Sequence, residues 1–408
     1  MFVRRGLIVV SFVVSLLAAA CGDSGSSTDS TAPGAEAGAD ISAAPDNSTP
    51  RPDTGRSDTT PAADQSTSSA DGAAVDTAVG DAIAAPDAAA AIDLKGVTCR
   101  TTPPANVTLA ASPKAYSGGT CPQLMSGTNT ITTAGGSRKF ILIFPSKIQP
   151  GETLPVMFAW HWLKGKAQKF VDEGDLAAAV EQQRFIAVLP EAKGDLSLFG
   201  LVDLPWPILN ITPQARYDEE FTFFDDMLAC VSKQLPVNKE CVSATGVSAG
   251  ALYIAQLAGA RGEYLSSVIS LSGGVGSQGL VNMWLRPLTP PAHKMPTLVL
   301  WGGPADSCAL LNFEVASKEL ISNLQAGGHY YIECTHNCQH GVPPVVAPPG
   351  KSRFSPIWEF ALEHPFWLPA GQSPLGGGVS APYGIPWCAV GATPTPRTGQ
   401  CDPPGCPI

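Results

Sequence analysis

Short apolar runs alternate with longer segments of mixed polarity from about residue 93 onward. The apolar runs have the length of buried strands, and the segments between them are long enough to form helices. This alternation is typical of a mostly parallel central sheet with helices on both faces, so it predicts an α/β fold. The predicted strands are 139–145, 154–160, 185–190, 241–247, 265–271, 297–301 and 329–333, and the predicted helices are 167–183, 217–235, 249–260, 309–325 and 355–363.

A separate apolar run near residue 1 predicts export. Arg4 and Arg5 precede the run 7–17, and three alanines then lead to Cys21. A run of about 11 residues is too short to span a bilayer as a mature helix, which needs about 20. A basic start, a short apolar run and small residues are the parts of a signal peptide, so residues 1–21 form a predicted export signal.

The role of Cys21 differs between two kinds of signal peptide. In an ordinary cleaved signal peptide this cysteine has no role. The stretch Leu-Ala-Ala-Ala-Cys instead resembles a bacterial lipobox, in which the cysteine is lipidated and becomes the mature N-terminus. We favour lipidation, which predicts a cell-envelope lipoprotein at the outer membrane or cell surface. The alternative location is the extracellular medium. No later segment is long and apolar enough to predict a transmembrane helix, so this anchor is the only predicted membrane contact.

Residues 22–92 have the composition of a linker. They carry twelve Asp or Glu against Arg51 and Arg56, and they contain only five Val or Ile and no Cys, Lys or aromatic residue. Such a segment cannot bury enough apolar surface to offset the entropy lost on ordering, so it is predicted to be a disordered tether. It either holds the following domain away from a lipid surface or is a dispensable insert.

The distribution of charge limits the classes of partner that the remaining chain can bind. The net charge is −10, but residues 93–408 carry 23 acidic and 21 basic residues and are nearly neutral. A nucleic-acid-binding protein needs a basic face, so nucleic acid is excluded as a partner. Residues 93–365 form the predicted catalytic domain. The Gly- and Pro-rich stretch 366–408 has no periodicity, and we expect it to be a tail that packs over this domain.

The motif Gly246-Val247-Ser248-Ala249-Gly250 joins the predicted strand 241–247 to the predicted helix 249–260. A strand, a tight turn and a helix around Gly-x-Ser-x-Gly are typical of a nucleophile elbow, which presents the serine hydroxyl above the sheet. The glycines are needed because side chains at these positions would collide with neighbouring backbone. The helix N-terminus beside the serine favours developing negative charge. Ser248 is therefore the predicted nucleophile.

A nucleophilic serine needs a base and an acid that orients the base. In this fold the acid follows a strand beyond the serine. Asp306 comes shortly after the predicted strand 297–301 and is the leading candidate. Asp225 and Asp226 precede the serine on a helical pattern, so we interpret them as structural. Glu333 ends a predicted strand but is too close in sequence to the histidine loop.

Two of the six histidines fall in the loop after the predicted strand 329–333, where the base belongs. We predict His340 as the base, because the turn His-Gly-Val-Pro can present its ring toward the serine. His336 is then a loop residue that faces the substrate. The other histidines precede the serine, precede the acid, begin a strand or lie beyond the last helix: His161, His293, His329 and His364.

The sequence around these residues resembles the poly(3-hydroxybutyrate) depolymerase and feruloyl-esterase-like group of α/β-hydrolases. The resemblance implies the α/β-hydrolase fold and the triad of Ser248, Asp306 and His340. It covers about residues 138–365. The stretches that carry it are 230–271, with the motifs 246–251 and 271–274, the Asp pair 225–226 and the late stretch 339–343.

The same resemblance implies an oxyanion hole made of two backbone N–H groups. The group usually has His-Gly followed by small residues after the strand 154–160, where this sequence has His161-Trp162-Leu163-Lys164-Gly165. The matching donors are the backbone N–H groups of Leu163 and Ala249.

Ten cysteines remain besides Cys21, and an even number in an exported chain predicts disulfides. Cys334, His336, Cys338 and His340 also resemble a metal cluster, but a triad needs His340 as a free base, so no metal is predicted. Cofactor motifs are absent, so no cofactor is predicted. The predicted pairs are Cys99 with Cys121, Cys230 with Cys241, Cys308 with Cys334 or Cys338, and the remaining loop cysteine with the tail, which contains Cys388, Cys401 and Cys406.

Together these features predict an exported serine hydrolase that acts on carboxylic esters, either small or polymeric. Polyhydroxyalkanoate, feruloyl and related esters are the candidate substrates. A serine peptidase of the same fold and a surface-displayed binding module with a silent triad are the alternatives. Trp162, Trp206 and Trp284 either line the cleft or pack in the core or a lid.

Overall fold

The structure is a computed structural model that describes residues 92–408 apart from 199, 278, 280, 377–384, 402–405, 407 and 408. The chain divides into two units, Met1–Ala85 and Pro86–Ile408. The predicted signal peptide, its lipidation site Cys21 and nearly all of the predicted linker lie outside the described residues. Within the described part, no helix is both long enough and apolar enough to cross a membrane.

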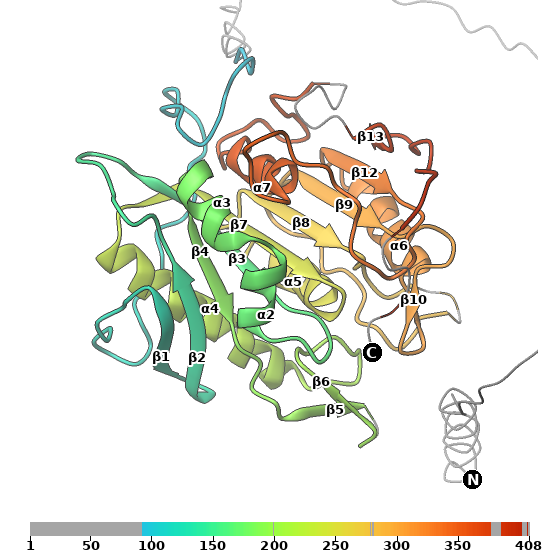
Figure 1. The fold of residues 1–408 in the computed structure, drawn as a ribbon. Helices are drawn as coiled ribbons and strands as arrows, with labels where there is room; N and C mark the ends of the chain where they lie inside the picture. The colour runs from blue at the N-terminus through green and yellow to red at the C-terminus, as the bar shows by residue number, and fades with distance from the viewer. Residues whose placement is uncertain are drawn as a thin grey trace, which may run out of the picture. The chain divides into compact units, whose positions relative to one another are not determined.

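A nine-stranded sheet forms the centre of the second unit (Figure 1). Its six central strands are parallel, and antiparallel strands extend it at both edges. This arrangement confirms the predicted mostly parallel sheet. In spatial order the strands are β1 (Gly127–Thr133), β2 (Gly136–Ile143), β4 (Ile186–Pro190), β3 (Leu154–Trp160), β7 (Val237–Val247), β8 (Ser267–Leu271), β9 (Thr297–Trp301), β12 (Tyr331–Thr335) and β13 (Cys388–Val390).

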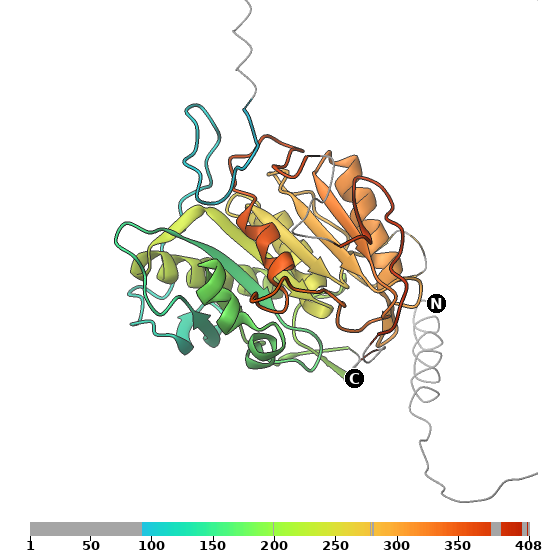
Figure 2. The ribbon, with the colours of Figure 1, turned by 45° about the horizontal axis from the view of Figure 1, so that its top comes forward.

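Helices cover both faces of this sheet, as Figures 1 and 2 show. On one face lie α2 (Ala167–Glu173), α3 (Leu176–Gln183) and α7 (Ser355–Leu362). On the other lie α4 (Gln214–Gln234), α5 (Ala249–Arg261) and α6 (Phe313–Ala326).

The central strands are apolar along their whole length because both of their faces are buried. All seven residues of β3 are buried. Its alternate side chains enter two different cores, since successive side chains of a strand point to opposite faces. Phe158 and Trp160 pack with α4 and α5, whereas Met157 and Ala159 pack with α2 and α7.

Two short hairpins lie outside the main sheet. β5 (Leu196–Leu198) pairs with β6 (Val202–Leu204), and β10 (Ser307–Cys308) pairs with β11 (Leu311–Asn312). Neither hairpin is predictable from the sequence, because each strand has only two or three residues and shows no extended apolar run.

The predicted helix 167–183 is wrong in one respect, because it is two helices. A Cβ atom at Gly174 would lie 2.7 Å from the carbonyl oxygen of Phe170, and Asp175 has a left-handed φ of 49°. The glycine ends α2, and the left-handed residue turns the chain into α3.

The edge strands β1 and β13 were also missed. β1 is rich in threonine and buries only alternate residues, so it forms no apolar run. β13 is three residues long and half-buried. It lies in the segment that was expected to be an irregular tail, and it pairs antiparallel with β12.

The ten cysteines from Cys99 onward are all in disulfides, but three predicted bonds are wrong. Cys99 bonds to Cys241 and Cys121 bonds to Cys230. The segment before β1 explains the exchange, because it lies along β7 and α4. Asn238 donates to the carbonyl oxygen of Cys99 at 2.6 Å, which places Cys99 beside β7 rather than beside Cys121.

The remaining disulfides join the acid and base loops to the tail. Cys308 bonds to Cys406, Cys334 to Cys388 and Cys338 to Cys401. The predicted bond from Cys308 to Cys334 or Cys338 is therefore wrong. β13 lies against β12 with Cys388 directly opposite Cys334, so the tail itself supplies the partners.

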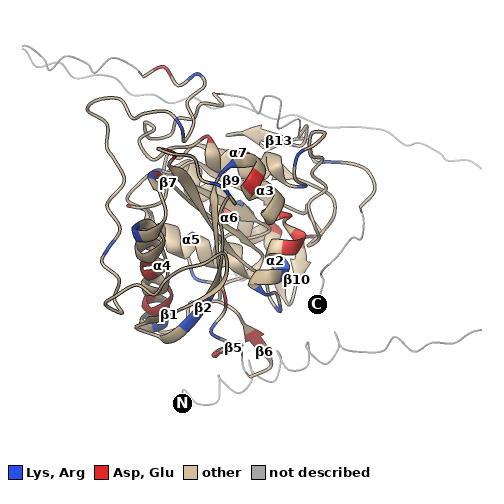
Figure 3. Cartoon of the chain, turned by 60° about the vertical axis from the view of Figure 1, so that its left-hand side comes forward, with Lys and Arg blue, Asp and Glu red and all other residues tan. Residues whose placement is uncertain are grey.

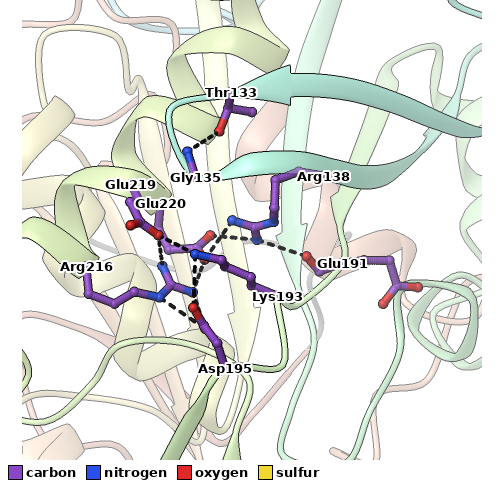
Figure 4. A network of polar contacts seen from close by, with 9 residues as sticks. All are labelled: Thr133, Gly135, Arg138, Glu191, Lys193, Asp195, Arg216, Glu219 and Glu220. Atoms are coloured by element: carbon purple, nitrogen blue, oxygen red, sulfur yellow. Dashed lines mark hydrogen bonds and ion pairs between the residues drawn. The ribbon is translucent and has the colours of Figure 1, made fainter.

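A network of ion pairs attaches α4 to β2 and to the loop after β4 (Figure 4). Charged residues of both signs lie along α4 in Figure 3. At the centre of the network, both guanidinium Nη atoms of Arg138 lie within 3.0 Å of the Glu220 carboxylate, and both side chains are at most 2% exposed. Arg216 also donates to Glu220 at 2.7 Å and to Asp195 at 2.9 Å.

Replacing Glu220 with alanine is expected to lower the free energy of unfolding by about 3–5 kcal/mol, because it leaves the buried Arg138 guanidinium without a carboxylate. Glu219→Ala is the matched control. Glu219 pairs with Lys193 in a partly exposed position, so its loss should cost at most about 1 kcal/mol. Urea unfolding of both variants measures the difference. Equal costs would show that the buried pair does not hold α4 on the sheet.

Candidate active site

Ser248 lies on a strained turn between β7 and α5. Its φ of 55° and ψ of −118° are unusual for a residue with a side chain. A Cβ atom at Gly246 would lie 2.5 Å from the backbone of Gly250, and one at Gly250 would collide with the carbonyl oxygen of Trp160. Both glycines are therefore required for steric reasons, as expected for a nucleophile elbow.

The structure brings the three predicted triad residues together. Ser248 Oγ lies 2.8 Å from His340 Nε2, and His340 Nδ1 lies 2.6 Å from Asp306 Oδ1. An ionised carboxylate only accepts hydrogen bonds, so Asp306 holds the proton of the ring on Nδ1. Nε2 is then left to accept a hydrogen bond from the serine hydroxyl.

Neighbouring parallel strands explain why the acid and the base meet. β9 and β12 pair in parallel, with Trp301 opposite Thr335, so the loops that follow them leave the same edge of the sheet. The two loops are bonded to each other. His336 N–H donates to the carbonyl oxygen of Trp301 at 3.0 Å, and Gln339 N–H donates to that of Gly302 at 3.1 Å.

Asp306 and His340 are each fixed by further contacts. Asp306 is fully buried, and its second carboxylate oxygen accepts the backbone N–H of Gly302 at 2.7 Å. The ring of Phe313 stacks on the His340 ring at a centroid distance of 4.0 Å. The sequence carries no signal for this role of Phe313, because nothing in a phenylalanine at the start of a helix indicates which ring it will contact.

The loop after β3 lies beside Ser248 and is held from behind. Trp206 Nε1–H donates to the carbonyl oxygen of His161 at 2.8 Å, and Trp206 is fully buried. Trp206 therefore packs in the core. Leu163 and Ser248 line the same two pockets, and Ala249 is the first residue of α5. The two residues named as backbone donors thus both lie near the serine.

His336 does not face the substrate, so that expectation is wrong. Its side chain is fully buried, and its Nδ1 accepts the backbone N–H of Cys338 at 3.1 Å. Its ring contacts Trp387 of the tail edge-on. The loop turns inward after β12, so the tail covers His336 and leaves His340 as the ring that reaches Ser248.

The other residues considered as the acid have partners elsewhere. Asp225 accepts from Arg261, and Asp226 accepts from Ser117. Glu333 lies within β12 and accepts from Trp301 Nε1–H at 3.1 Å. Cys334 and Cys338 are in disulfides, so neither offers a thiolate to a metal. Within the described residues, no group of three or more His, Cys, Asp or Glu side chains is placed to hold a metal ion.

A large pocket, here called pocket A, opens beside Ser248 and His340. It encloses about 960 Å³, including its open mouth. Aromatic side chains from the β3–α2 region and from the end of the domain dominate its wall, and Lys164 and Glu173 are its two charged lining residues. The aromatic lining residues are Trp162, Phe170, Phe354 and Trp358.

The tail reaches the base loop through polar contacts as well as disulfides. Arg397 N–H donates to the carbonyl oxygen of Thr335 at 2.9 Å, and its guanidinium donates to Asn337 Oδ1 at 2.7 Å. Asn337 Nδ2 donates in turn to the carbonyl oxygen of Gly399 at 2.7 Å. Tail residues therefore fix the backbone just before His340.

Burial lowers the pKa of His161, His293, His336 and His364 to about 4. In the unfolded chain a histidine pKa is about 6.5, so between these values the unfolded state binds more protons than the folded state. The free energy of unfolding should therefore fall as pH falls from about 6.5 toward 4, by up to about 1.4 kcal/mol per pH unit for each histidine. Urea unfolding at pH 7.5, 6 and 5 measures this slope. His293→Phe, which keeps a ring against Phe366, should reduce the slope; an unchanged slope would contradict the assignment.

No family model matches the chain. In sequence it is similar to feruloyl esterase D of Neurospora crassa, with 25% identity over 175 residues, which are 40% of this chain and 56% of that protein. The chain thus spans little more than half the length of the curated relative that it matches.

Solved structures match a larger part of the chain. Native pOPH has a TM-score of 0.51 and 15% identity, and the match covers 68% of this chain and 98% of that one. Native sOPH has a TM-score of 0.50 and 16% identity, and the match covers 66% of this chain and 96% of that one. At these identities the likenesses show the fold alone. The chain therefore has the α/β-hydrolase fold.

Proposed function

We propose that the protein is an exported serine hydrolase that cleaves carboxylic esters. One observation carries this proposal: Ser248, His340 and Asp306 form a continuous chain of hydrogen bonds at the wall of an apolar pocket. The similarity to a feruloyl esterase over 175 residues supports an ester as the substrate. Feruloyl, polyhydroxyalkanoate and related esters are the proposed substrates.

In the proposed mechanism, His340 Nε2 takes the hydroxyl proton of Ser248 while Oγ attacks the ester carbonyl carbon. Asp306 keeps the ring oriented and stabilises its positive charge. The imidazolium then gives its proton to the leaving alkoxide oxygen as the acyl-enzyme forms. Water attacks the acyl-enzyme with His340 as base, and Ser248 is released with the free acid.

We further propose that the backbone N–H groups of Leu163 and Ala249 bind the oxyanion of the tetrahedral intermediate. Ala249 begins α5, whose N-terminus carries partial positive charge. Leu163 belongs to the loop that the hydrogen bond from Trp206 to His161 holds in place. Such donors typically contribute about 10²–10³-fold to kcat.

A panel of substrates tests ester hydrolysis against the two other functions. Short-chain, feruloyl and polyhydroxyalkanoate esters, each with a matched amide where one exists, are assayed with wild-type protein and with Ser248→Ala. We expect cleavage of at least one ester class by the wild type and none by the variant. Faster cleavage of an amide than of its ester would favour a peptidase, and binding without turnover of any ester would favour a binding module.

Export and lipidation at Cys21 are part of the proposal. The described residues contain five disulfides, and such bonds persist in oxidising compartments. Cys21→Ser is expected to abolish lipid attachment and to move the protein from the membrane fraction to the soluble fraction with unchanged specific activity. Metabolic labelling with a fatty-acid analogue measures attachment. Equal labelling of wild type and Cys21→Ser would contradict lipidation at this residue.

A further inference from the structure

A second pocket, here called pocket B, also meets Ser248. It is smaller than pocket A, with which it shares Leu163, Ser248 and Cys308. The serine thus stands between two hollows rather than at the end of one. Pocket B is lined by Leu163, Leu198, Val202, Leu204, Ile208, Leu209, Ser248, Ala249, Trp284, Cys308, Ala309, Leu311 and Phe313.

The β5–β6 hairpin builds one wall of pocket B by strand alternation. Leu198 pairs with Val202, and both line the pocket, whereas Ser197 and its partner Asp203 are exposed on the opposite face. Three further segments complete the wall: the stretch after β6, the segment around Trp284 and the β10–β11 hairpin. The first two are bonded to each other, since Asn210 N–H donates to the carbonyl oxygen of Trp284 at 2.8 Å.

The lining of pocket B is hydrocarbon almost throughout. None of its described lining residues is charged, and apart from Ser248 the side-chain polar atom available is the Trp284 indole N–H. A sugar or a charged group needs hydrogen-bonding partners when it leaves water, and this wall does not supply them. Five exposed apolar residues lie within three positions of a lining residue in the sequence. These exposed neighbours are Leu201, Ile211, Val281, Met283 and Leu310.

His340 determines which part of an ester each pocket receives. In the proposed reaction its ring must reach the leaving alkoxide oxygen, so the alcohol group leaves on the side that His340 faces. His340 lines pocket A but not pocket B. Ala249, a proposed oxyanion donor, lines pocket B only. The acyl group therefore extends toward pocket B while the alcohol group lies in pocket A.

We propose that pocket B is the acyl subsite and that it selects uncharged hydrocarbon acyl groups longer than acetyl. This inference rests on the proposed ester hydrolysis and specifies the substrate. Because pocket A is also mostly apolar, the preferred esters carry apolar groups on both sides of the carbonyl. Val202 and Leu204 then determine acyl-chain length.

The test compares two series of esters on variants of the β5–β6 hairpin. Wild type, Val202→Trp, Leu204→Ala and the control Ser197→Trp are assayed with p-nitrophenyl esters from acetate to octanoate and with acetate esters of alcohols of increasing length. For wild type and the control we expect kcat/KM to rise with acyl length by up to about 4-fold per methylene buried. Val202→Trp should remove this rise because it fills the pocket, and Leu204→Ala should move the optimum to longer acyl chains.

Each outcome has a distinct meaning. An acyl-length profile that is the same in all four proteins, or a change in the alcohol series instead, would overturn the acyl subsite while ester hydrolysis stands. If the wild type hydrolyses no ester in either series, the proposed function itself fails. The Leu204→Ala variant keeps the test decisive if the tryptophan variant does not fold, because it enlarges the pocket instead of filling it.

Discussion

Replacing Ser248 with alanine is expected to lower kcat for ester hydrolysis by about 10⁴–10⁶-fold while leaving the thermal unfolding midpoint nearly unchanged. The variant lacks the atom that attacks the carbonyl, and a smaller side chain does not disturb the turn that Gly246 and Gly250 form. Steady-state kinetics and differential scanning calorimetry measure the two quantities.

His340→Ala should lower kcat by a similar factor, because the serine and the histidine act on one proton transfer. The double variant Ser248→Ala with His340→Ala should have a kcat no lower than that of either single variant, because the effects of residues that act as a unit are not additive. Asp306→Asn should also lower kcat, but by a smaller factor. His336→Ala is the comparison for His340→Ala: if it abolishes activity while His340→Ala retains it, the assignment of the base is wrong.

The second large effect concerns the disulfide between Cys338 and Cys401. It closes a loop with a sequence separation of 63 and ends two residues before His340. Replacing both cysteines with serine should lower the free energy of unfolding by about 4 kcal/mol in the chain-entropy model. It should also lower kcat, because the base loop loses a covalent link to the tail that orders it.

The pair Cys121 and Cys230 provides the matched control for this effect. It closes a longer loop, with a sequence separation of 109, and joins the segment before β1 to α4. Removing it should cost a similar free energy of unfolding, yet kcat measured well below the unfolding midpoint should stay near that of the wild type. Equal losses of kcat in the two double variants would show that the tail stabilises the fold without ordering the base loop.

The sequence was most informative where local chemistry determines the structure. The apolar runs predicted the central strands because those strands are buried on both faces, and all seven residues of β3 confirm this. The turn around Ser248 was predicted because a side chain at Gly246 would collide with the backbone of Gly250, which is only four residues away. In both cases the sequence signal lies within the residues of the strand or turn itself.

Prediction from the sequence failed where contacts between distant segments determine the structure. The cysteine pairs were wrong because the path of the segment before β1 along β7 is a tertiary feature, with no trace in the spacing of Cys99 and Cys121. β13 was missed because a strand of three residues forms only through its pairing with β12. The same holds for pocket B, whose wall comes from two hairpins too short to give a pattern.

The most direct test of the central claim is covalent labelling with a fluorophosphonate, followed by mass spectrometry of the peptides. Such a probe reacts with a serine that a neighbouring base activates. We predict one adduct, on Ser248 in the wild-type protein, strongly reduced in His340→Ala and unchanged in His336→Ala. An unlabelled Ser248 in folded wild-type protein, or an adduct on a different serine, would contradict the proposal that Ser248, His340 and Asp306 form a working catalytic triad.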